Sequence, residues 1–327
     1  MTKLTVKVDS QILTAMNSCP ELYRLSHIEH WRPLTKAAPL EKGTMMHHML
    51  KVYREGKRDG KVGPGEHNLL VEKCIFIGQA NAANTDSMTA EDIEHEIVTF
   101  KEYVLKWQYD GWEILDVEQP FAKLLYENSS VCEYLDKVYS GLRIIYEGRI
   151  DARVRDPKLG VVVVDSKTES RRSFPYILNN QFQGYEWAFG CPVIIDKIGF
   201  QVTLEATDPK PDEKGRDKSK FRRLLHDSGG AAIAEWQRDT IEQVKQAIEW
   251  HRQLDSKQRT SLMKNRTSCD KFSGCDFQMV CQVPEESRDF KLIAYFYKDR
   301  PWDPAAEADD VALDEVADDI IEQEIQK

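Results

Sequence analysis

The first feature that could do chemistry is a group of two acidic residues and a lysine on two consecutive apolar segments. Asp151 lies on the first segment, and Asp165 and Lys167 lie near the end of the second, which begins with a run of valines. The intervening Asp156-Pro-Lys-Leu-Gly160 is typical of a tight turn, so the two segments are predicted to be neighbouring strands. Because side chains alternate along a strand, Asp165 and Lys167 share a face. Two carboxylates that hold a divalent cation, with an ammonium near the water that the cation acidifies, suit hydrolysis of a phosphodiester.

The alternative interpretation is a surface ion pair, which is the usual meaning of an isolated Asp-x-Lys sequence. The run Val161–Val164 favours a catalytic role, because it is apolar without alternation, as in a central strand that is buried on both faces. Charged residues that close such a strand lie at the carboxyl end of the sheet, where open α/β sheets tend to place their sites. On these residues alone both interpretations stay open.

Two more patterns flank this pair of strands. Gly43-Thr-Met-Met-His47 lies upstream at the start of a predicted helical region, and Gln181-Phe-Gln-Gly-Tyr185 lies downstream at helical spacing. In this order the patterns resemble those of the RecB-like branch of the PD-(D/E)XK nuclease superfamily, over roughly residues 10 to 285. The resemblance implies an α/β fold with a restriction-endonuclease-like mixed sheet flanked by helices. It also implies an N-terminal helical region and a C-terminal cysteine segment.

The resemblance assigns the metal ligands and the catalytic lysine. His47, Asp151 and Asp165 would hold Mg²⁺ or Mn²⁺, with the Ser166 carbonyl as a candidate further oxygen ligand. Lys167 would position the attacking water and stabilise the charge of the transition state. A neutral imidazole suits Mn²⁺ better than Mg²⁺, so a histidine ligand implies stronger activity with Mn²⁺.

Other residues of these patterns have plainer alternatives. Gln181 and Tyr185 would line the wall of the site and touch the DNA backbone, as the resemblance implies. A glutamate on the preceding strand can approach the metal in the resembled family, which makes Glu118 a candidate, but an exposed strand residue explains it equally well. His48 stands beside His47, and only the spacing from the upstream glycine selects His47.

The cysteines form a second pattern. The chain shows no sign of export, so disulfides are not expected and metal binding is favoured for some of its seven cysteines. Three are scattered within predicted elements and are expected to be buried small residues: Cys74, Cys132 and Cys191. The other four comprise one near the N-terminus and three in a loop-like stretch near the C-terminus: Cys19, Cys269, Cys275 and Cys281.

Four thiolates can close a zinc site or hold an iron–sulfur cluster. Structural zinc sites usually contain closely spaced cysteine pairs, which this sequence lacks. One N-terminal cysteine with three near the C-terminus resembles the iron–sulfur subset of RecB-like nucleases, which includes AddB-type nuclease domains and CRISPR-associated exonucleases. The resemblance implies a 4Fe–4S cluster on the four cysteines. Their spacing is wider than in many members, so zinc stays an alternative.

The net charge of −10 is concentrated at the C-terminus. Residues 301–327 contain ten Asp or Glu and one Lys, so residues 1–300 carry 44 Lys or Arg against 45 Asp or Glu. A nearly neutral folded part can still form a local positive groove. The candidate is segment 210–223, predicted to be either a solvated loop or a flexible loop that reaches DNA phosphates through Lys218, Lys220, Arg222 and Arg223.

The remaining sequence supplies the elements that must position these residues. Helices are predicted over 11–17, 21–30, 41–58, 66–83, 90–109, 181–189 and 231–253, and strands over 113–126, 141–155, 159–167 and 195–204. This predicts a helical region at 1–110, a nuclease core with the cysteine segment at 111–300 and an acidic, disordered tail at 301–327. The tail is solubilising by default, and otherwise binds a protein partner or mimics DNA. Apolar runs of membrane-spanning length and a secretory signal are missing, so a cytoplasmic protein is expected.

These expectations combine into a metal-dependent deoxyribonuclease. By resemblance it would be an exonuclease that acts on DNA ends or single strands in recombination, repair or replication. The alternative is a catalytically weak accessory protein that holds DNA ends for a recombination, replication or CRISPR-adaptation complex. A carboxylate pair repels phosphate, which argues against a site used for binding alone. The sequence has no helicase-type phosphate loop, so any unwinding must come from a partner.

Overall fold

The computed structural model describes most of the chain before its C-terminal tail. The described residues are 2–34, 38–61, 65–83, 87–130, 132–134, 137–169, 178–201, 205–207, 218–256, 260–269, 274–301 and 304. The first part of the predicted basic loop, 208–217, lies outside them. So does the acidic tail, apart from Pro301 and Pro304.

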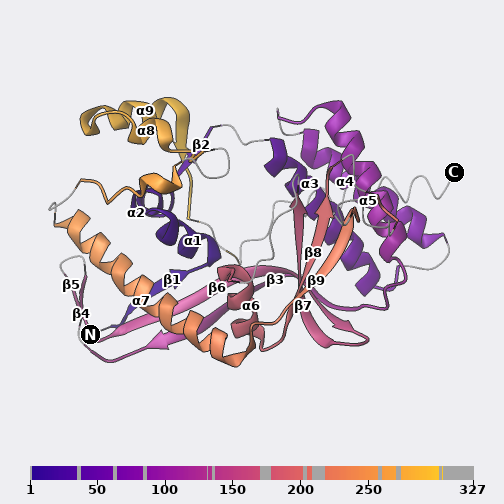
Figure 1. The fold of residues 1–327 in the computed structure, drawn as a ribbon, viewed down its shortest axis with the longest axis horizontal. Coiled ribbons are helices and arrows are strands. Elements are labelled where there is room, and N and C mark those ends of the chain that lie inside the picture. The colour runs from indigo at the N-terminus through magenta and orange to yellow at the C-terminus, as the bar shows by residue number, and fades with distance from the viewer. Residues whose placement is uncertain are drawn as a thin grey trace.

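A mixed sheet forms the centre of the molecule (Figure 1). Over the described residues it has six strands, in the order β1-β6-β7-β8-β9, with β3 also paired to β6. The strands are β1 (Leu4–Val8), β3 (Glu113–Glu127), β6 (Leu142–Asp156), β7 (Gly160–Glu169), β8 (Val193–Gly199) and β9 (Phe221–His226). β1 is parallel to β6 and β7 is parallel to β8, while the other neighbours are antiparallel.

Helices cover both faces of this sheet (Figure 1). One face packs against α1 (Ser10–Ser18), α6 (Asn180–Phe189) and α7 (Gly229–Asp255). The other packs against α3 (Ala38–Arg58), α4 (Glu66–Ala83) and α5 (Ala90–Trp107), which share one core with β8 and β9. A mixed sheet between two layers of helices confirms the predicted fold class.

The turn between β6 and β7 forms as predicted. Asp156 Oδ1 accepts hydrogen bonds from the backbone N–H groups of Lys158 at 2.7 Å and Leu159 at 2.9 Å. Gly160 has a φ of 76°, a conformation that glycine adopts without strain. The valines that follow are buried between β6 and β8, so β7 is a central strand, as its unbroken apolar run indicates.

Several boundaries differ from the prediction. Helix α1 begins at Ser10 rather than at Gln11, because Asp9 caps it by accepting a hydrogen bond from Ile12 N. The helix predicted over 21–30 divides into α2 (Pro20–Tyr23) and a π-helical turn η1 (Arg24–Ile28). Strand β8 begins at Val193 rather than at residue 195 and ends before Phe200, while the last predicted residues, 202–204, lie outside the described part of the chain. Strands β1 and β9 were not predicted, although β1 alternates apolar and polar residues.

The C-terminal segment lies beside the first elements of the chain (Figure 1). It comprises η2 (Arg266–Ser268), α8 (Gln278–Cys281), η4 (Glu285–Ser287), α9 (Arg288–Tyr295) and β10 (Phe296–Lys298). β10 pairs with β2 (Trp31–Pro33) in a two-stranded antiparallel ribbon, and another ribbon joins β4 (Cys132–Tyr134) to β5 (Lys137–Tyr139). Within the described ranges, no helix is long and apolar enough to cross a membrane.

Candidate active site

The two strands that carry the acidic residues separate at those residues. Pairing of β6 with β7 ends at Ala152, and β7 continues beside β8. The next residues along the two strands are Asp151 and Asp165. The backbone N–H of Ser166 donates a hydrogen bond to Asp151 Oδ2 at 2.7 Å. This fork, defined by the divergence of β6 and β7, therefore holds Asp151 against the end of the strand that carries Asp165 and Lys167.

The other edge of β6 is irregular at the same point. Glu118 stands opposite Asp151 between two regular pairs of the β3–β6 ladder, and its φ is 49°. The side-chain alternation of β6 also changes here, because Ile150 packs with α6 whereas Ala152 packs in a separate cluster with Trp112. Positive φ is uncommon for a residue other than glycine and often marks a functional site. Burial, and then the charge of Asp151, raises the pKa of Glu118 to about 8.

Asp165 is the most enclosed acid of the fork, with 1% of its surface exposed. Its Oδ2 lies 2.7 Å from Lys167 Nζ, and its Oδ1 accepts a hydrogen bond from Gln181 Nε2 at 3.0 Å. Burial raises the pKa of Asp165, an effect that Lys167 opposes and Asp151 reinforces. The pKa of Asp151 moves down, because the charges of His47, Arg54 and Lys167 outweigh the effect of its burial.

Helix α6 brings Gln181 and Tyr185 to the fork. The Gln181 amide also donates to the Tyr185 hydroxyl at 2.9 Å, and this hydroxyl donates to the Arg149 carbonyl at 2.8 Å. Tyr185 is only 4% exposed and supports Gln181 from behind, and its contact with the DNA backbone stays a prediction. The buried ring fixes the amide that in turn fixes Asp165.

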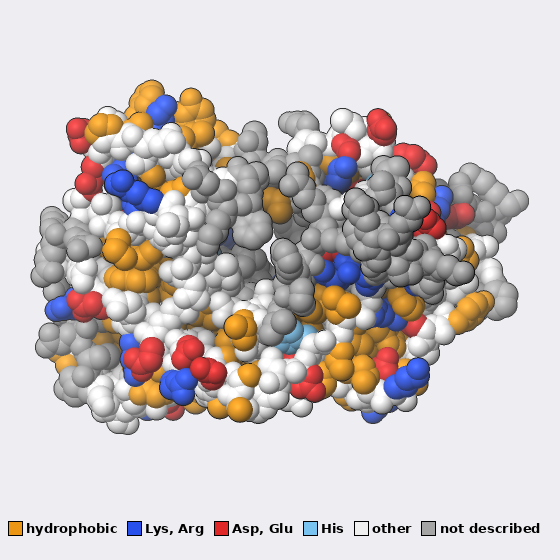
Figure 2. Space-filling model, viewed as in Figure 1, with side chains coloured by type: hydrophobic (Ala, Val, Ile, Leu, Met, Phe, Trp, Pro, Cys, Tyr) orange, Lys and Arg blue, Asp and Glu red, His pale blue; other side chains and the backbone are white. Residues whose placement is uncertain are grey.

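Helix α3 supplies His47 from the opposite side. His47 Nδ1 lies 3.4 Å from Asp151 Oδ2. A Cβ on Gly43 would lie 2.9 Å from Thr168 Oγ1, so a glycine at this position lets α3 approach the end of β7. His47, His48 and Lys167 line one cavity of about 800 Å³. The face seen in Figure 2 is hollowed between the lobe of α1, α8 and α9 and the lobe of α3, α4 and α5.

A buried polar network behind the fork was missed by the sequence analysis. Arg54, two turns after His47 on α3, donates from Nη2 to Ser166 Oγ at 2.7 Å and lies 3.6 Å from Asp196 Oδ2. Asp196 of β8 also accepts a hydrogen bond from the Tyr103 hydroxyl. The seven-residue spacing on α3 and the acid within the apolar strand β8 were the available signals.

The residues of the fork fit a divalent cation. Asp165 Oδ2 is buried and has the Lys167 ammonium 2.7 Å away, and two carboxylates at close range favour a further compensating cation. Oxygen ligands of this kind are those that Mg²⁺ and Mn²⁺ prefer. Among the described residues no group of three or more His, Cys, Asp or Glu side chains has a metal-binding geometry. The ligand set therefore stays a prediction.

The four cysteines of the second pattern surround a cavity of about 270 Å³. Cys19 lies between α1 and α2, and its sulfur accepts a hydrogen bond from Asn265 N at 3.3 Å. Cys275 N donates to the Cys269 carbonyl at 2.9 Å, and Cys281 ends α8. Burial raises the pKa of the Cys281 thiol to about 11, with the neighbouring cysteines adding to the shift. The fold thus brings together the four residues that the sequence singles out.

The basic residues predicted to reach phosphates belong to strand β9 and to the bridge that precedes it. Lys220 and Arg222 form ion pairs with carboxylates of α5 and β7. Arg223 is enclosed by two tryptophan rings, with its guanidinium carbon 3.9 Å and 3.4 Å from the ring centroids, and donates to Asp110 at 2.8 Å. Lys218 is half-buried beside Glu205. Three of these four charges are balanced within the protein, which corrects the expectation of a free basic loop.

A family model described as the PD-(D/E)XK nuclease superfamily matches residues 11–282, and no curated protein has a significant match. A solved structure described as SSO0001 is 15% identical, with a TM-score of 0.25, covering 71% of this chain and 84% of that chain. An alkaline exonuclease (LHK-Exo) from Laribacter hongkongensis is 12% identical, with a TM-score of 0.27, covering 62% of this chain and 92% of that chain. Likenesses this distant carry no argument about activity, but the family match spans most of the sequence. The chain belongs to the PD-(D/E)XK nuclease superfamily.

Proposed function

We propose that this protein is a metal-dependent deoxyribonuclease of the RecB-like branch, and that it digests DNA from ends or in single-stranded form. The observation that carries the proposal is the convergence of Asp151, Asp165, Lys167 and Gln181 at the fork between β6 and β7. The family match supports nuclease chemistry, and the resemblance of the sequence motifs supports the branch and the exonuclease mode.

The chain's own residues would divide the work as follows. Asp151, Asp165 and the Ser166 carbonyl would hold Mg²⁺ or Mn²⁺. The bound ion would acidify a water molecule and offset charge on the scissile phosphate. Gln181 fixes the orientation of Asp165, since its amide donates to Oδ1. The Lys167 side chain is 28% exposed and lines the cavity that His47 also lines. There its ammonium would orient the attacking water and stabilise developing negative charge.

Two further residues would complete the metal site. His47 reaches Asp151 from α3 and would contribute an imidazole nitrogen, which favours Mn²⁺ over Mg²⁺. Glu118 stands opposite Asp151 on β3, and a carboxyl with a pKa of about 8 is protonated at neutral pH until a cation replaces its proton. Glu118 is therefore a candidate ligand that exchanges a proton for metal.

The test is digestion of end-labelled single-stranded and double-stranded DNA with Mn²⁺, with wild type beside Lys167→Ala. We expect the wild type to cut and the variant to lose at least about a hundredfold in rate while still binding DNA, because the lysine acts on the reaction rather than on binding. The ladder of labelled products reports the polarity of digestion.

A wild type that binds DNA and never cuts it would contradict the nuclease proposal. It would favour the second candidate, an accessory protein that holds DNA ends for a recombination, replication or CRISPR-adaptation complex. A Lys167→Ala variant that cuts at the wild-type rate would instead exclude this fork as the active site.

We further propose that Cys19, Cys269, Cys275 and Cys281 hold a 4Fe–4S cluster, with zinc as the alternative. Support comes from their arrangement around one cavity, to which the N-terminal part of the chain contributes Cys19 and the C-terminal segment contributes the other three. Such a cluster would tie the C-terminal segment to α1 and α2, which lead into the helix that carries His47. Its role would be structural, because a tie between distant segments restricts the unfolded chain.

A further inference from the structure

The ribbon of β2 and β10 has an inner and an outer face. On the inner side Phe296 stacks on Phe277, with ring centroids 4.8 Å apart and planes 10° apart, and Trp31 packs on the same cluster. Side chains alternate along each strand, so the neighbouring pair, Arg32 opposite Tyr297, lies on the outer face. Tyr297 is 43% exposed. A cation and an aromatic ring therefore stand side by side on the outer face.

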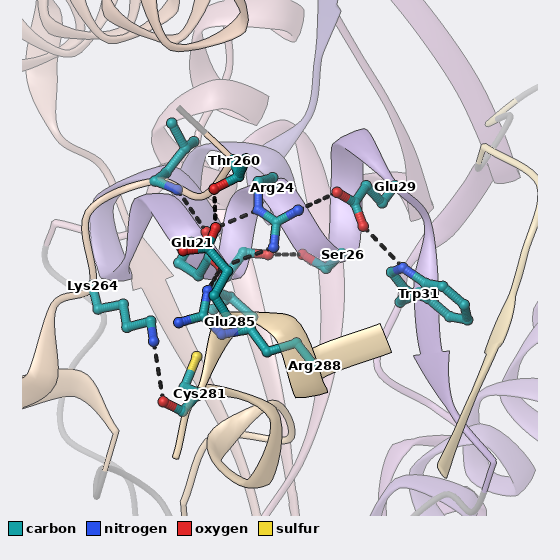
Figure 3. Close-up of polar contacts among 12 residues, drawn as sticks. Glu21, Arg24, Ser26, Glu29, Trp31, Thr260, Lys264, Cys281, Glu285 and Arg288 are labelled. Carbon is teal, nitrogen blue, oxygen red and sulfur yellow. Dashed lines mark hydrogen bonds and ion pairs between the residues drawn. The ribbon is translucent and has the colours of Figure 1, made fainter. Parts of the chain in front are cut away.

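A buried ion network holds this ribbon in place (Figure 3). Glu29 accepts a hydrogen bond from Trp31 Nε1 at 3.0 Å and pairs with Arg24. Arg24 in turn binds the fully buried Glu21 through two bonds of 2.9 Å. Glu21 also accepts from Leu262 N at 2.8 Å, which links the N-terminal elements to the C-terminal segment. The outer face is thus preorganised, and a ligand would pay little ordering entropy on binding to it.

The outer face leads to the catalytic fork through η1. Arg32 Nη1 donates to the Ser26 carbonyl at 2.6 Å. Ser26 and His27 line a cavity of about 360 Å³ whose far side is formed by Gln181, the residue that orients Asp165. This volume is comparable with pockets that enclose a small organic molecule, such as one unpaired nucleotide, and is far too small for a double helix. Arg32 thus joins the outer face to a residue that lines the cavity beside Gln181.

The charges along this surface complement a nucleic-acid strand. Arg300 is exposed near the outer pair, whereas Lys298 lies over the Trp31 ring at 5.0 Å on the other side of the ribbon. Glu29 is engaged by Arg24, which leaves Asp299 as the exposed acid next to the ribbon. Burial, and then the charge of Arg32, lowers the pKa of His27 to about 4, so the ring is neutral and planar at physiological pH. Aromatic faces interleaved with cations are the features by which proteins bind single strands, because only an unpaired base can stack on a side chain.

We propose that the outer face of the β2–β10 ribbon and the cavity beside His27 bind the single-stranded segment of DNA that leads into the active site. Tyr297 stacks on a base, Arg32 contacts a phosphate, and the cavity holds one unpaired nucleotide beside Gln181. The inference rests on the proposed nuclease function and assigns the path of its substrate.

The test measures binding by fluorescence anisotropy in the full-length Lys167→Ala background, with a labelled single strand of about 15 nucleotides, long enough to span both sites. Tyr297→Ala should weaken binding about tenfold, and Tyr297→Phe should retain it, because the ring rather than the hydroxyl stacks on the base. Arg32→Ala should reduce the slope of log K against log salt by about 0.7, the value for one phosphate contact on a single strand.

Matched controls come from side chains far from this surface. Tyr109 is 90% exposed and Arg238 is 67% exposed at the side chain, so Tyr109→Ala and Arg238→Ala remove the same groups without touching the ribbon. Both should bind single strands like the wild type. Thermal unfolding of each variant checks that the ribbon substitutions leave the fold intact.

The outcomes separate this inference from the proposed function. If the protein binds and cuts single strands but Tyr297→Ala binds them as tightly as Tyr109→Ala, the path is wrong and the nuclease proposal stands. An equal loss for a blunt duplex would overturn the single-strand assignment, because stacking requires an unpaired base. A wild type that neither binds nor cuts DNA would remove both proposals.

Discussion

Asp151 and Asp165 lie in the same fork and yet have opposite pKa shifts. Lys167 bonds directly to Asp165, but burial dominates there and raises the pKa of this carboxyl. Asp151 is reached by His47, Arg54 and Lys167 and by the Ser166 N–H, and together they lower its pKa despite its burial. Closely spaced carboxylates that differ in this way are typical of sites that bind a cation or transfer protons.

At the residue scale, Arg54 is predicted to position the metal site. Its guanidinium bonds Ser166 Oγ and faces Asp196, so Arg54→Lys would keep the charge and lose the planar geometry. We expect this variant to bind Mn²⁺ about tenfold more weakly, as for other residues that orient metal ligands. Calorimetric titration with Mn²⁺ at fixed pH measures the change directly.

Ser166→Ala provides the matched comparison for Arg54. If the two residues act through their hydrogen bond, the losses of Mn²⁺ affinity should not add. The double variant Arg54→Lys/Ser166→Ala should then have nearly the same affinity as whichever single variant binds Mn²⁺ less tightly. Fully additive losses would mean that Arg54 acts on the site by another route. Unchanged Mn²⁺ affinity in Arg54→Lys would reduce its role to supplying charge.

At the scale of elements, close approaches between helices and strands build the site. Gly43 lets α3 meet the end of β7, and Gly184 leaves room on α6 for the Tyr146 hydroxyl, where an added Cβ would lie 2.1 Å away. The first contact delivers His47 to the fork, and the second delivers Gln181. A larger residue at either position would push a helix away from the strands, and so displace a residue of the site.

Helix α5 contains a buried acid that makes stability depend on pH. Glu96 has no exposed surface, and its carboxylate accepts no hydrogen bond from the described residues, although His95 Nδ1 lies 3.6 Å away. Burial raises the pKa of Glu96 from 4.5 to about 8. Between these values the folded protein keeps a proton that the unfolded chain has lost. The free energy of unfolding should therefore fall by up to about 1.4 kcal/mol per pH unit.

Glu96→Gln should remove this contribution. The variant should lose less stability than the wild type as the pH rises from about 4.5 to about 8, and above that window it should be the more stable protein. Urea unfolding at a series of pH values measures both curves, and Glu94→Gln, on the same helix, serves as the control. Parallel curves for wild type and Glu96→Gln would show that Glu96 is ionised in the folded protein at neutral pH.

At the scale of the whole molecule, the first and last parts of the chain are joined twice. One joint is the buried Glu21, which binds Arg24, Leu262 N and, at 3.7 Å, Arg288 (Figure 3). The other is the cysteine cavity, where Ser268 Oγ donates to the Ser18 carbonyl across 250 positions of sequence. Both joints hold the elements that lead into α3, so they affect the site without contacting it.

Cys275→Ser tests the second joint. If the four cysteines hold an iron–sulfur cluster, the wild type should be coloured and the variant colourless. Loss of a tie that closes so long a loop is worth about 5 kcal/mol, so the variant should also unfold at a markedly lower temperature. Metal analysis, the visible spectrum and thermal unfolding provide the readouts. Cys191→Ser, which lies outside the cavity, should keep the colour, and a colourless wild type with bound zinc would contradict the iron–sulfur assignment.

The sequence by itself determined the elements whose signals are local. The turn at Asp156–Gly160, the central strand with its acid and lysine, and the long helices α3, α4 and α5 follow from residue type and periodicity. The positions of Asp165 and Lys167 could be predicted because they follow a recognisable apolar run near the end of a strand. Asp151 lies within its strand and was selected by the motif of the resembled family. The separation of Cys19 from the other three cysteines was a pattern that residue counting alone could detect.

Only the tertiary structure decided how these parts meet. Arg54, Asp196 and Tyr103 come from three elements distant in sequence, and no local pattern indicates that a buried network joins them. Lys220 and Arg222 were predicted to lie in a loop, because the partners that hold them lie on α5 and β7, far along the chain. The ribbon pairs β2 with β10, two strands that are more than 250 residues apart in the sequence. Neither strand could be predicted from its own residues, because strand pairing depends on contacts in space.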